Sequence, residues 1–367
     1  MKKVLQFFAI LFLVGLPFLL MESWLRLSHF NSQFPFKEHP SAGYILQPHY
    51  QGMAPKMFNS PRPIAIQINS IGLRAPEINP TTPANLTRII VLGDDGVFGL
   101  GVREEHTFSN LTQKILNDNT IANYHYQVIN AGIPGYSSYQ SLQLLKHNLL
   151  NLNPNVVIVY LGWNDHRISW NGRPDREHFL LIHRSLLHRL KTSQFNILSQ
   201  TFTYQWFLDS LLQIQIESQN KKKWHLPKTQ KTRVPIEQFA NNLREIIQLA
   251  KNNGFGVLFI TQPHGYTSEN LPKKYLTPSQ LNQKEGLLGA HKQYNETVRK
   301  VAEESNIVLL DLEKFFSQSD ASSLMEKDGI LPNRAGNRII AFEIAKALRH
   351  FSQFKPRHTT EFREDSF

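Results

Sequence analysis

The sequence predicts an α/β fold: a three-layer α/β/α, doubly wound sheet of about five parallel strands. Short runs of Val, Ile and Leu without alternation are typical of central parallel strands that are covered on both faces. Longer amphipathic segments separate these runs, and strand–helix alternation of this kind gives right-handed crossovers. The 367 residues are enough for one large domain of this type. The expected strands are residues 88–92, 127–130, 156–160, 256–261 and 307–310.

The segments between and around these strands complete the expected organisation. Apolar residues recur at helical spacing in 108–117, 139–150, 236–251 and 294–304. We expect one domain over 88–352, with an insertion at 166–235 that we interpret as a helical excursion with a loop over the sheet edge. The Pro-, Asn- and Gly-rich residues 27–87 are interpreted as an irregular spacer and cap, and 353–367 as a polar tail.

The N-terminus carries an apolar run that predicts a membrane segment. Lys2 and Lys3 precede an uncharged run at 4–21, and a helix of that length, at ~1.5 Å per residue, spans most of a ~30 Å hydrocarbon core. No small-residue cleavage pattern follows, and Trp24 suits the membrane interface. We therefore expect residues 1–26 to be an uncleaved signal anchor in the cytoplasmic membrane. The rest of this single-pass chain would be extracytoplasmic, and periplasmic in a Gram-negative cell.

Composition narrows the classes of function. Lys and Arg number 40 against 29 Asp and Glu, a net charge of +11. The basic residues are spread along the chain and no nucleic-acid-binding motif accompanies them, so we expect no nucleic-acid partner. The absence of cysteine excludes disulfides and thiol chemistry. No cofactor and no metal site is expected.

Polar turns follow the first three expected strands, and a fourth polar segment precedes the last helix. In doubly wound sheets, ligands bind beyond the carboxyl ends of the strands, where such turns come together. These turns are therefore the candidate site. They read G-D-D-G-V-F-G at 93–99, N-A-G-I-P-G-Y at 130–136, G-W-N-D at 162–165 and D-G-I-L-P-N-R-A-G at 328–336.

Taken in this order, the four segments resemble those of the SGNH/GDSL hydrolase family, membrane-anchored bacterial type, over residues 88–350. The resemblance implies a flavodoxin-like SGNH fold and action on ester bonds. In that family the first block reads G-D-S, and its serine is the nucleophile. The glycine of the second block and the asparagine of the third join the serine N–H in an oxyanion hole. The last block reads D-x-x-H and supplies the acid and the base of the triad.

Carried over residue by residue, the resemblance places Gly132 and Asn164 at the oxyanion positions and Asp328 at the triad acid. Asp95 stands at the serine position and Leu331 at the histidine position. A serine becomes nucleophilic only when a positioned base takes its proton, and a leucine cannot take one. Asp95 also brings a negative charge to a site that binds developing negative charge. We therefore expect the usual Ser-His-Asp chemistry to be absent.

Several neighbouring side chains have a structural and a functional interpretation. Asp94 is expected to hold loops through hydrogen bonds, and Asp165 and His166 lie beside the cleft. His166 is a candidate replacement base, although a surface histidine is the plainer interpretation. Ser137 and Ser138 are expected to cap the following helix, since they are not at the nucleophile position.

Two function classes share this fold. The first is a catalytically inactive, membrane-tethered protein that binds a ligand or partner at the cell envelope, with an envelope polysaccharide or an envelope protein as the partner. The alternative is an active ester hydrolase or O-acyltransferase on envelope polysaccharide, with an unconventional constellation around Asp95, His166 and Asp328. Two independent substitutions in the triad favour the first class.

Overall fold

The computed structural model of the protein divides the chain into two compact units: Met1–Phe36 with Leu180–Leu226, and Lys37–Phe179 with Pro227–Phe367. Most of the insertion predicted at 166–235 and the tail predicted at 353–367 lie outside the described residues. The structure describes residues 2–27, 36–54, 60–120, 123–167, 169, 173–177, 201, 203–204, 206–207, 210, 231–266 and 286–351.

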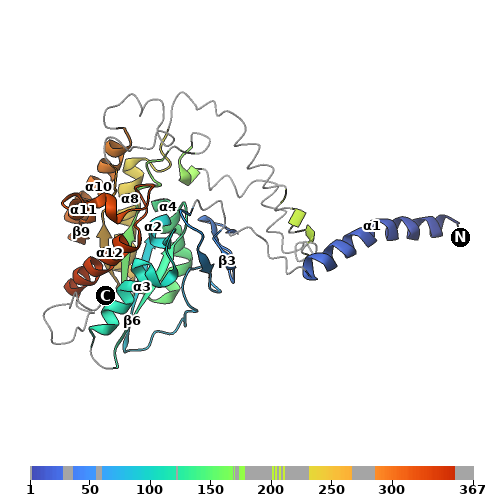
Figure 1. Ribbon diagram of the computed structural model, residues 1–367, viewed down its shortest axis with the longest axis horizontal. Helices are drawn as coiled ribbons and strands as arrows, with labels where there is room; N and C mark the ends of the chain where they lie inside the picture. Colours follow the sequence, from blue (N-terminus) through green and yellow to red (C-terminus); the bar gives the residue numbers. More distant parts are fainter. Residues whose placement is uncertain are drawn as a thin grey trace. The chain divides into compact units, whose positions relative to one another are not determined.

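A parallel five-stranded sheet forms the centre of the second unit (Figure 1). Its strand order is β6-β5-β7-β8-β9. The first strand in sequence, β5, therefore lies inside the sheet, the second, β6, forms one edge, and β7, β8 and β9 follow in order towards the other edge. The predicted fold class and all five predicted strands are confirmed, with ends shifted by up to two residues. The strands are β5 (Leu86–Gly93), β6 (His125–Gly132), β7 (Val156–Tyr160), β8 (Gly256–Ile260) and β9 (Val308–Leu310).

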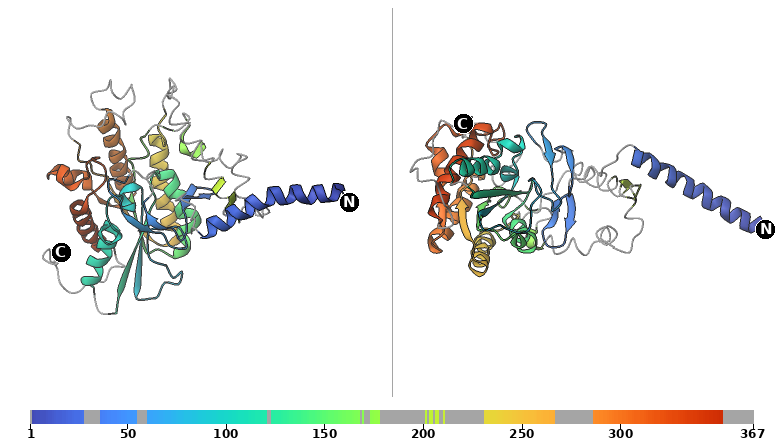
Figure 2. Two further views of the ribbon diagram at one scale, coloured as in Figure 1. Left: turned by 45° about the vertical axis from the view of Figure 1, so that its right-hand side comes forward. Right: turned by 90° about the horizontal axis from the view of Figure 1, so that it is seen from below.

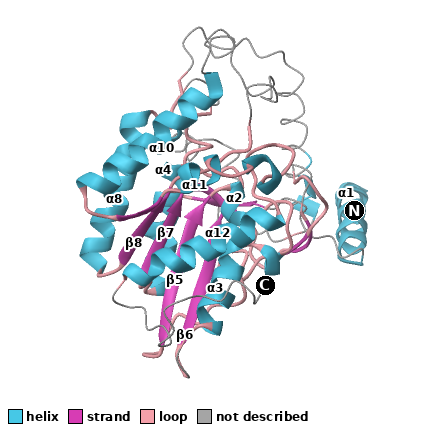
Figure 3. Ribbon diagram, turned by 60° about the vertical axis from the view of Figure 1, so that its left-hand side comes forward, coloured by secondary structure: helices cyan, strands magenta, loops and turns pink. Residues whose placement is uncertain are grey.

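Helices cover both faces of this sheet (Figures 2 and 3). Of these, α3 packs against α12 on one face, whereas α8 packs against α4 and α10 on the other. Local sequence sets their ends: Thr107 caps α3, Asn333 caps α12, and Gly254 ends α8 in a left-handed conformation. The helices are α2 (Asp95–Phe98), α3 (Phe108–Asp118), α4 (Ser138–Leu144), α8 (Ile236–Asn253), α10 (Gly286–Glu304), α11 (Leu312–Ser317) and α12 (Arg334–Ala347).

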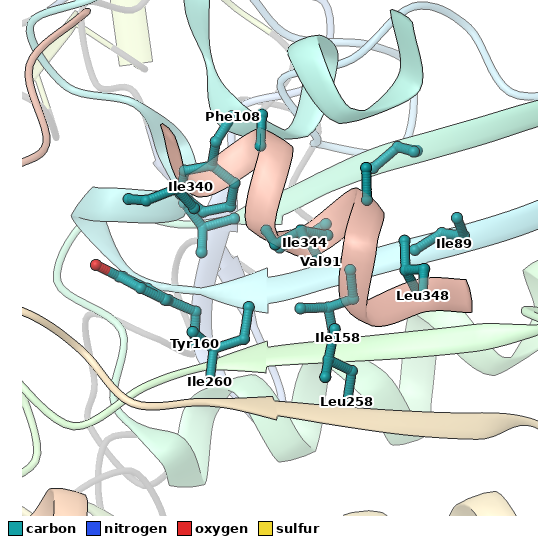
Figure 4. Close-up of a cluster of buried hydrophobic side chains, with 14 of the residues drawn as sticks. Ile89, Val91, Phe108, Ile158, Tyr160, Leu258, Ile260, Ile340, Ile344 and Leu348 are labelled. Carbon is teal, nitrogen blue, oxygen red and sulfur yellow. The ribbon is translucent and has the colours of Figure 1, made fainter. Parts of the chain in front are cut away.

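The main core lies between the sheet and the layer of α3, α11 and α12 (Figure 4). Ile89, Val91 and Ile158 project from the strands, and Ile340 and Ile344 of α12 pack over them. Because each buried aliphatic side chain of this kind contributes about 1.5–3 kcal/mol, the cluster fixes α12 over the sheet. It thereby also fixes the Asp328 loop, which leads into α12.

The segment before the sheet is more ordered than its composition predicted. Residues 27–87 were expected to be irregular, but they contain two short pairs of strands. Arg74 from this segment is buried and donates hydrogen bonds to the carbonyl oxygens of Phe98, Gly99 and Val102 at 2.8, 2.9 and 3.0 Å. This segment therefore braces the turn after α2. The strands are β1 (Phe36–His39), β2 (Gly43–Leu46), β3 (Gln51–Met53) and β4 (Ala65–Gln67).

In the first unit, α1 runs from Lys2 to Leu27 and contains the apolar run at 4–21. Near its end, both the amide and the hydroxyl of Thr203 donate to Glu22, each at 2.9 Å. Within the described part of the chain, no helix meets the combined length and apolarity needed to cross a membrane. The membrane anchor stays a prediction.

Candidate functional site

The polar turns predicted at the strand ends converge around the carboxylate of Asp95, the first residue of α2. Its Oδ2 accepts a hydrogen bond from the amide of Gly135 at 3.1 Å and another from Nδ2 of Asn164 at 3.0 Å. Asn164 is fully buried, and its second amide hydrogen goes to the carbonyl oxygen of Tyr136 at 3.0 Å. Two donors directed at one anionic oxygen are the geometry of an oxyanion hole. Here the anionic oxygen belongs to the protein itself.

The structure corrects the prediction that Gly132 donates in this hole. The amide of Gly132 donates instead to Oδ1 of Asn130 at 3.0 Å, within the end of β6. A Cβ added at Gly132 would lie 2.2 Å from the backbone nitrogen of Phe98, so this glycine is needed for close packing of β6 against α2. The donor facing Asp95 is Gly135, three residues later, whose φ is +81°. That left-handed conformation favours glycine and aims its amide at Asp95.

Asp328 and Leu331 lie in the loop before α12. Oδ1 of Asp328 accepts hydrogen bonds from the amides of Ile330 and Leu331 at 2.9 and 3.0 Å, which closes a tight turn. Burial, with the neighbouring charge of Asp95 also contributing, raises the pKa of Asp328 above its usual value. The Leu331 side chain is buried and has no group that can exchange a proton. The loop therefore brings a second carboxylate near Asp95, but no histidine.

Asp94 holds the first turn in place, as the sequence predicted. Its Oδ1 accepts the amide of Gly96 at 3.0 Å and caps α2, and its Oδ2 accepts Nε2 of Gln262 at 3.2 Å. Burial, followed by the charge of Asp95, raises the pKa of Asp94 to about 7. Asp94 and Asp95 thus differ in role: one ties loops together beneath the site, and the other lies in it.

Asp165 and His166 are buried behind Asn164. Oδ1 of Asp165 accepts the amide of Ser138 at 2.9 Å, at the start of α4, and burial raises the pKa of Asp165 to about 7. Nε2 of His166 lies 3.3 Å from Nδ1 of His291, and burial lowers the pKa of His166 to about 3. Nε2 of His291 lies 2.7 Å from the carbonyl oxygen of Gln262, so it must donate there and its Nδ1 accepts from His166.

These contacts decide how the His166 candidate fits the site. Among the described residues, no hydrogen bond or ring contact joins His166 to Asp95 or Asp328. The hydrogen-bond directions leave His166 neutral and tied to His291, so it is a buried structural histidine and not a surface one. Ser137 caps α4 as predicted, and its hydroxyl donates to Asp175 at 2.7 Å. The structure therefore brings together Asp95, Gly135, Asn164 and Asp328, and keeps His166 apart.

The two ends of the insertion meet beside this site. Arg233 donates to the carboxylate of Asp175 at 2.7–3.2 Å and to the carbonyl oxygen of Gly135 at 2.8 Å. Backbone hydrogen bonds join Ser169 to Lys231 and Asp175 to Arg233, at 2.9 and 2.7 Å. Arg233 thus holds the turn that carries the Gly135 amide. No sequence motif signalled this pairing, because the partners are 58 positions apart.

Among the described residues, no three His, Cys, Asp or Glu side chains are arranged to hold a metal ion. The site presents the carboxylates of Asp95 and Asp328, the donors around them and the exposed side chain of Arg167. Arg167 acts on the pKa values of Asp94 and Asp328 in the downward direction, opposing the larger effect of burial.

Comparison with known proteins identifies the family. Among solved structures, the chain is similar to a lipase/acylhydrolase from Enterococcus faecalis (16% identity, 74% of this chain and 100% of that chain covered, TM-score 0.45). It is also similar to the acetyl xylan esterase AlAXEase (21%, 71% and 99%, 0.42) and to Axe2, an acetylxylan esterase from Geobacillus stearothermophilus (15%, 71% and 94%, 0.42). A search of curated proteins gives no match. The model of the GDSL-like Lipase/Acylhydrolase family matches residues 91–339, more than half of the chain and nearly the span of the predicted resemblance, so the chain belongs to this family.

Proposed function

We propose that this chain is a non-catalytic member of the family that binds a ligand or partner in the strand-end cleft at the cell envelope. The observation that carries the proposal is the position of Oδ2 of Asp95, which takes the hydrogen bonds of both Gly135 and Asn164. A tetrahedral intermediate needs those donors for its own negative oxygen. Asp95 therefore both replaces the nucleophile and occupies the donors.

The surroundings of Asp95 support the same proposal. The triad mechanism needs a base that contacts the nucleophile, and Leu331 stands where the resemblance places that base. His166, which directly follows the G-W-N-D segment, is hydrogen-bonded to His291. Asp95 has no hydroxyl proton for a base to take, and no histidine among the described residues stands beside it to protonate a leaving group, so the serine-enzyme cycle is not available to it.

The charges of the cleft favour a sugar or a cationic group as the ligand. Asp95 and Asp328 present carboxylate oxygens, which accept hydrogen bonds from hydroxyl or ammonium groups. Arg167 provides an opposing positive charge that acts on the same loops. The proposed partners are accordingly an envelope polysaccharide or an envelope protein that carries such groups.

The proposal includes a tether to the cytoplasmic membrane, with the second unit on the extracytoplasmic side. It rests on the Lys-flanked apolar run at 4–21 and on the exposure of apolar side chains along α1. Leu13, Leu19 and Leu20 are 71%, 62% and 61% exposed. An apolar helix surface of this kind is stabilised by transfer out of water.

Rebuilding the triad tests the loss of catalysis. We expect the wild-type protein to hydrolyse no p-nitrophenyl acetate and to react with no fluorophosphonate probe. The double variant Asp95→Ser with Leu331→His should gain slow turnover and probe labelling, because Asp328 and Asn164 are already near the rebuilt pair. Each single variant is the matched control and should stay inactive. Turnover by the wild type that is lost in Asp95→Asn would show an active enzyme and contradict the proposal.

A complementation experiment tests whether the cleft is used. In a deletion strain, Asp95→Ala should fail to restore the lost function while reaching the membrane in wild-type amounts. Asp118→Ala, an exposed carboxylate at the end of α3, is the control and should complement fully. If Asp95→Ala complements as well as the wild type, the cleft is not the functional site.

A further inference from the structure

A groove of about 560 Å³ lies between α3, α11 and α12. Its volume lies within the range of about 300–1,000 Å³ that is typical of small-molecule sites. Most of its lining is apolar, and charged side chains come only from α12. The apolar side chains are Leu111, Ile115, Phe315, Ala335, Ile339 and Phe342.

This apolar lining gives α12 two apolar stripes. Ile340 and Ile344 face the core (Figure 4), while Ile339 and Phe342, three residues apart on a neighbouring stripe, line the groove. The second stripe lies where α12 packs beside α3. Phe315 of α11 lines the same groove and keeps 39% of its surface exposed. Leu111, Ile339 and Phe342 are partly buried against the rim of the core, and with Phe315 they leave apolar surface facing the groove.

The charges around the groove are unequal. Lys346 is neutralised by Glu343, at 3.1 and 3.2 Å, and its ammonium lies 5.5 Å from the ring centre of Phe342. Arg338 lies one turn before Phe342 on α12. It is exposed and has no carboxylate partner among the described residues. One guanidinium therefore remains at an apolar groove, and its planar donors match a carboxylate in bidentate geometry.

We propose that this groove binds a free long-chain carboxylate, with the alkyl chain along Leu111, Ile339 and Phe342 and the carboxylate paired with Arg338. The inference concerns a second site and does not rest on the proposed function of the Asp95 cleft. A docked protein would bury about 800 Å² on each partner, whereas one alkyl chain fits within a groove of about 560 Å³. A single unpaired cation beside an apolar groove fits an amphiphile with one anionic end.

A chain-length series tests both halves of the site. Calorimetric titration of the full chain with octanoate, decanoate and dodecanoate should give one saturable site. Each pair of added CH₂ groups should tighten Kd by roughly tenfold until the groove is filled. Phe315→Ser, which removes part of the apolar wall, should weaken dodecanoate and dodecanol alike.

The charge half is tested by Arg338→Gln, with Arg334→Gln as the matched control, since Arg334 is exposed on α12 one turn earlier and does not line the groove. Arg338→Gln should raise the Kd for dodecanoate about tenfold and leave dodecanol unchanged, whereas Arg334→Gln should change neither. The proposal is wrong if the wild type shows no saturable binding, or if both arginine variants weaken dodecanoate equally.

Two other occupants give distinct results, and each would overturn the proposal. Concentration-dependent self-association that Phe315→Ser abolishes would make the groove an interface between copies of this chain. Binding of dodecanoate by a chain ending at residue 351, but not by the full chain, would assign the groove to the C-terminal residues. Measuring sedimentation and titration on the same samples separates these outcomes.

Discussion

Buried titratable groups around the site have pKa values shifted in opposite directions. Burial raises the pKa values of Asp94 and Asp165 to about 7, against about 3.9 in an unfolded chain. Burial lowers the pKa of His166 to about 3, against about 6.5 when unfolded. Folding therefore holds protons on the two carboxyl groups and keeps one off the imidazole.

These shifts have opposite effects on stability as the pH changes. The contribution of Asp94 and Asp165 is present at low pH and is lost as the pH rises through about 7. The contribution of His166 is present above about pH 6.5 and is lost as the pH falls towards 3. Between about pH 4.5 and 6.5 the effects oppose each other, but two carboxyl groups outweigh one imidazole. We therefore expect the wild-type free energy of unfolding to fall as the pH rises, by about 1 kcal/mol per pH unit.

Single substitutions should expose each effect. Asp165→Asn keeps an acceptor for Ser138 but removes the titration, so its free energy of unfolding should rise relative to wild type by about 1 kcal/mol per pH unit between pH 4.5 and 6.5. His166→Phe should change the slope by a similar amount in the opposite direction. Urea unfolding at several pH values measures both. Slopes parallel to wild type in both variants would show that neither group titrates as described.

At the scale of elements, the strands were predictable because each is a short Val-, Ile- or Leu-rich run bounded by turn residues. The strands β1 to β4 were not, because three or four residues are too few for an alternating pattern to appear. The helix predicted at 139–150 is a composite: α4 is followed by a π-helical segment, Leu145–Leu149, and a 3₁₀ turn. Hydrophobic spacing indicated the helix but not its change of hydrogen bonding.

The second polar turn shows a similar limit for the site. Its sequence offered two glycines, and the resemblance placed the donor at Gly132. Which glycine donates depends on the folded structure. Gly132 is confined by α2, whereas Gly135 has the positive φ that turns its amide towards Asp95. Neither the steric contact nor the turn geometry can be derived from the order N-A-G-I-P-G alone.

The contact of β6 with α2 leads to a prediction about Gly132. A Cβ in Gly132→Ala would meet backbone atoms of Phe98 and Val97 at 2.2 and 2.7 Å, so α2 must shift and carry Asp95 with it. We expect a loss of about 3 kcal/mol in the free energy of unfolding. Gly254→Ala is the control: no atom lies within 4 Å of the added Cβ, and only its φ of +74° opposes the change, at about 1 kcal/mol. Equal losses in urea unfolding would argue against the steric role of Gly132.

At the scale of the whole molecule, the proposed tether determines where the cleft operates. Because Lys2 and Lys3 flank the apolar run, a periplasm-dependent phosphatase fused after residue 367 should be active, and the fusion should sediment with membranes. Replacing Leu13 and Leu16 by Arg should move the protein to the soluble fraction and abolish phosphatase activity. An active fusion that is soluble and starts near residue 22 would contradict the anchor while retaining export. An inactive fusion would contradict both.

The two ends of the insertion are hydrogen-bonded to each other, at Ser169–Lys231 and Asp175–Arg233, so we expect the residues between them to be replaceable. The amide of Asp175 and the carbonyl of Arg233 are 2.7 Å apart, so the domain already closes this gap without the intervening chain. Loop-closure entropy grows only slowly with length, by about 0.6 kcal/mol per doubling, so many lengths of insert are tolerated at such a junction. A chain in which a short Gly-Ser linker replaces residues 178–230 should therefore fold, with a cooperative urea transition near that of wild type. The same junction would accept a foreign domain as a graft, whereas breaking the Asp175–Arg233 pair should remove that tolerance.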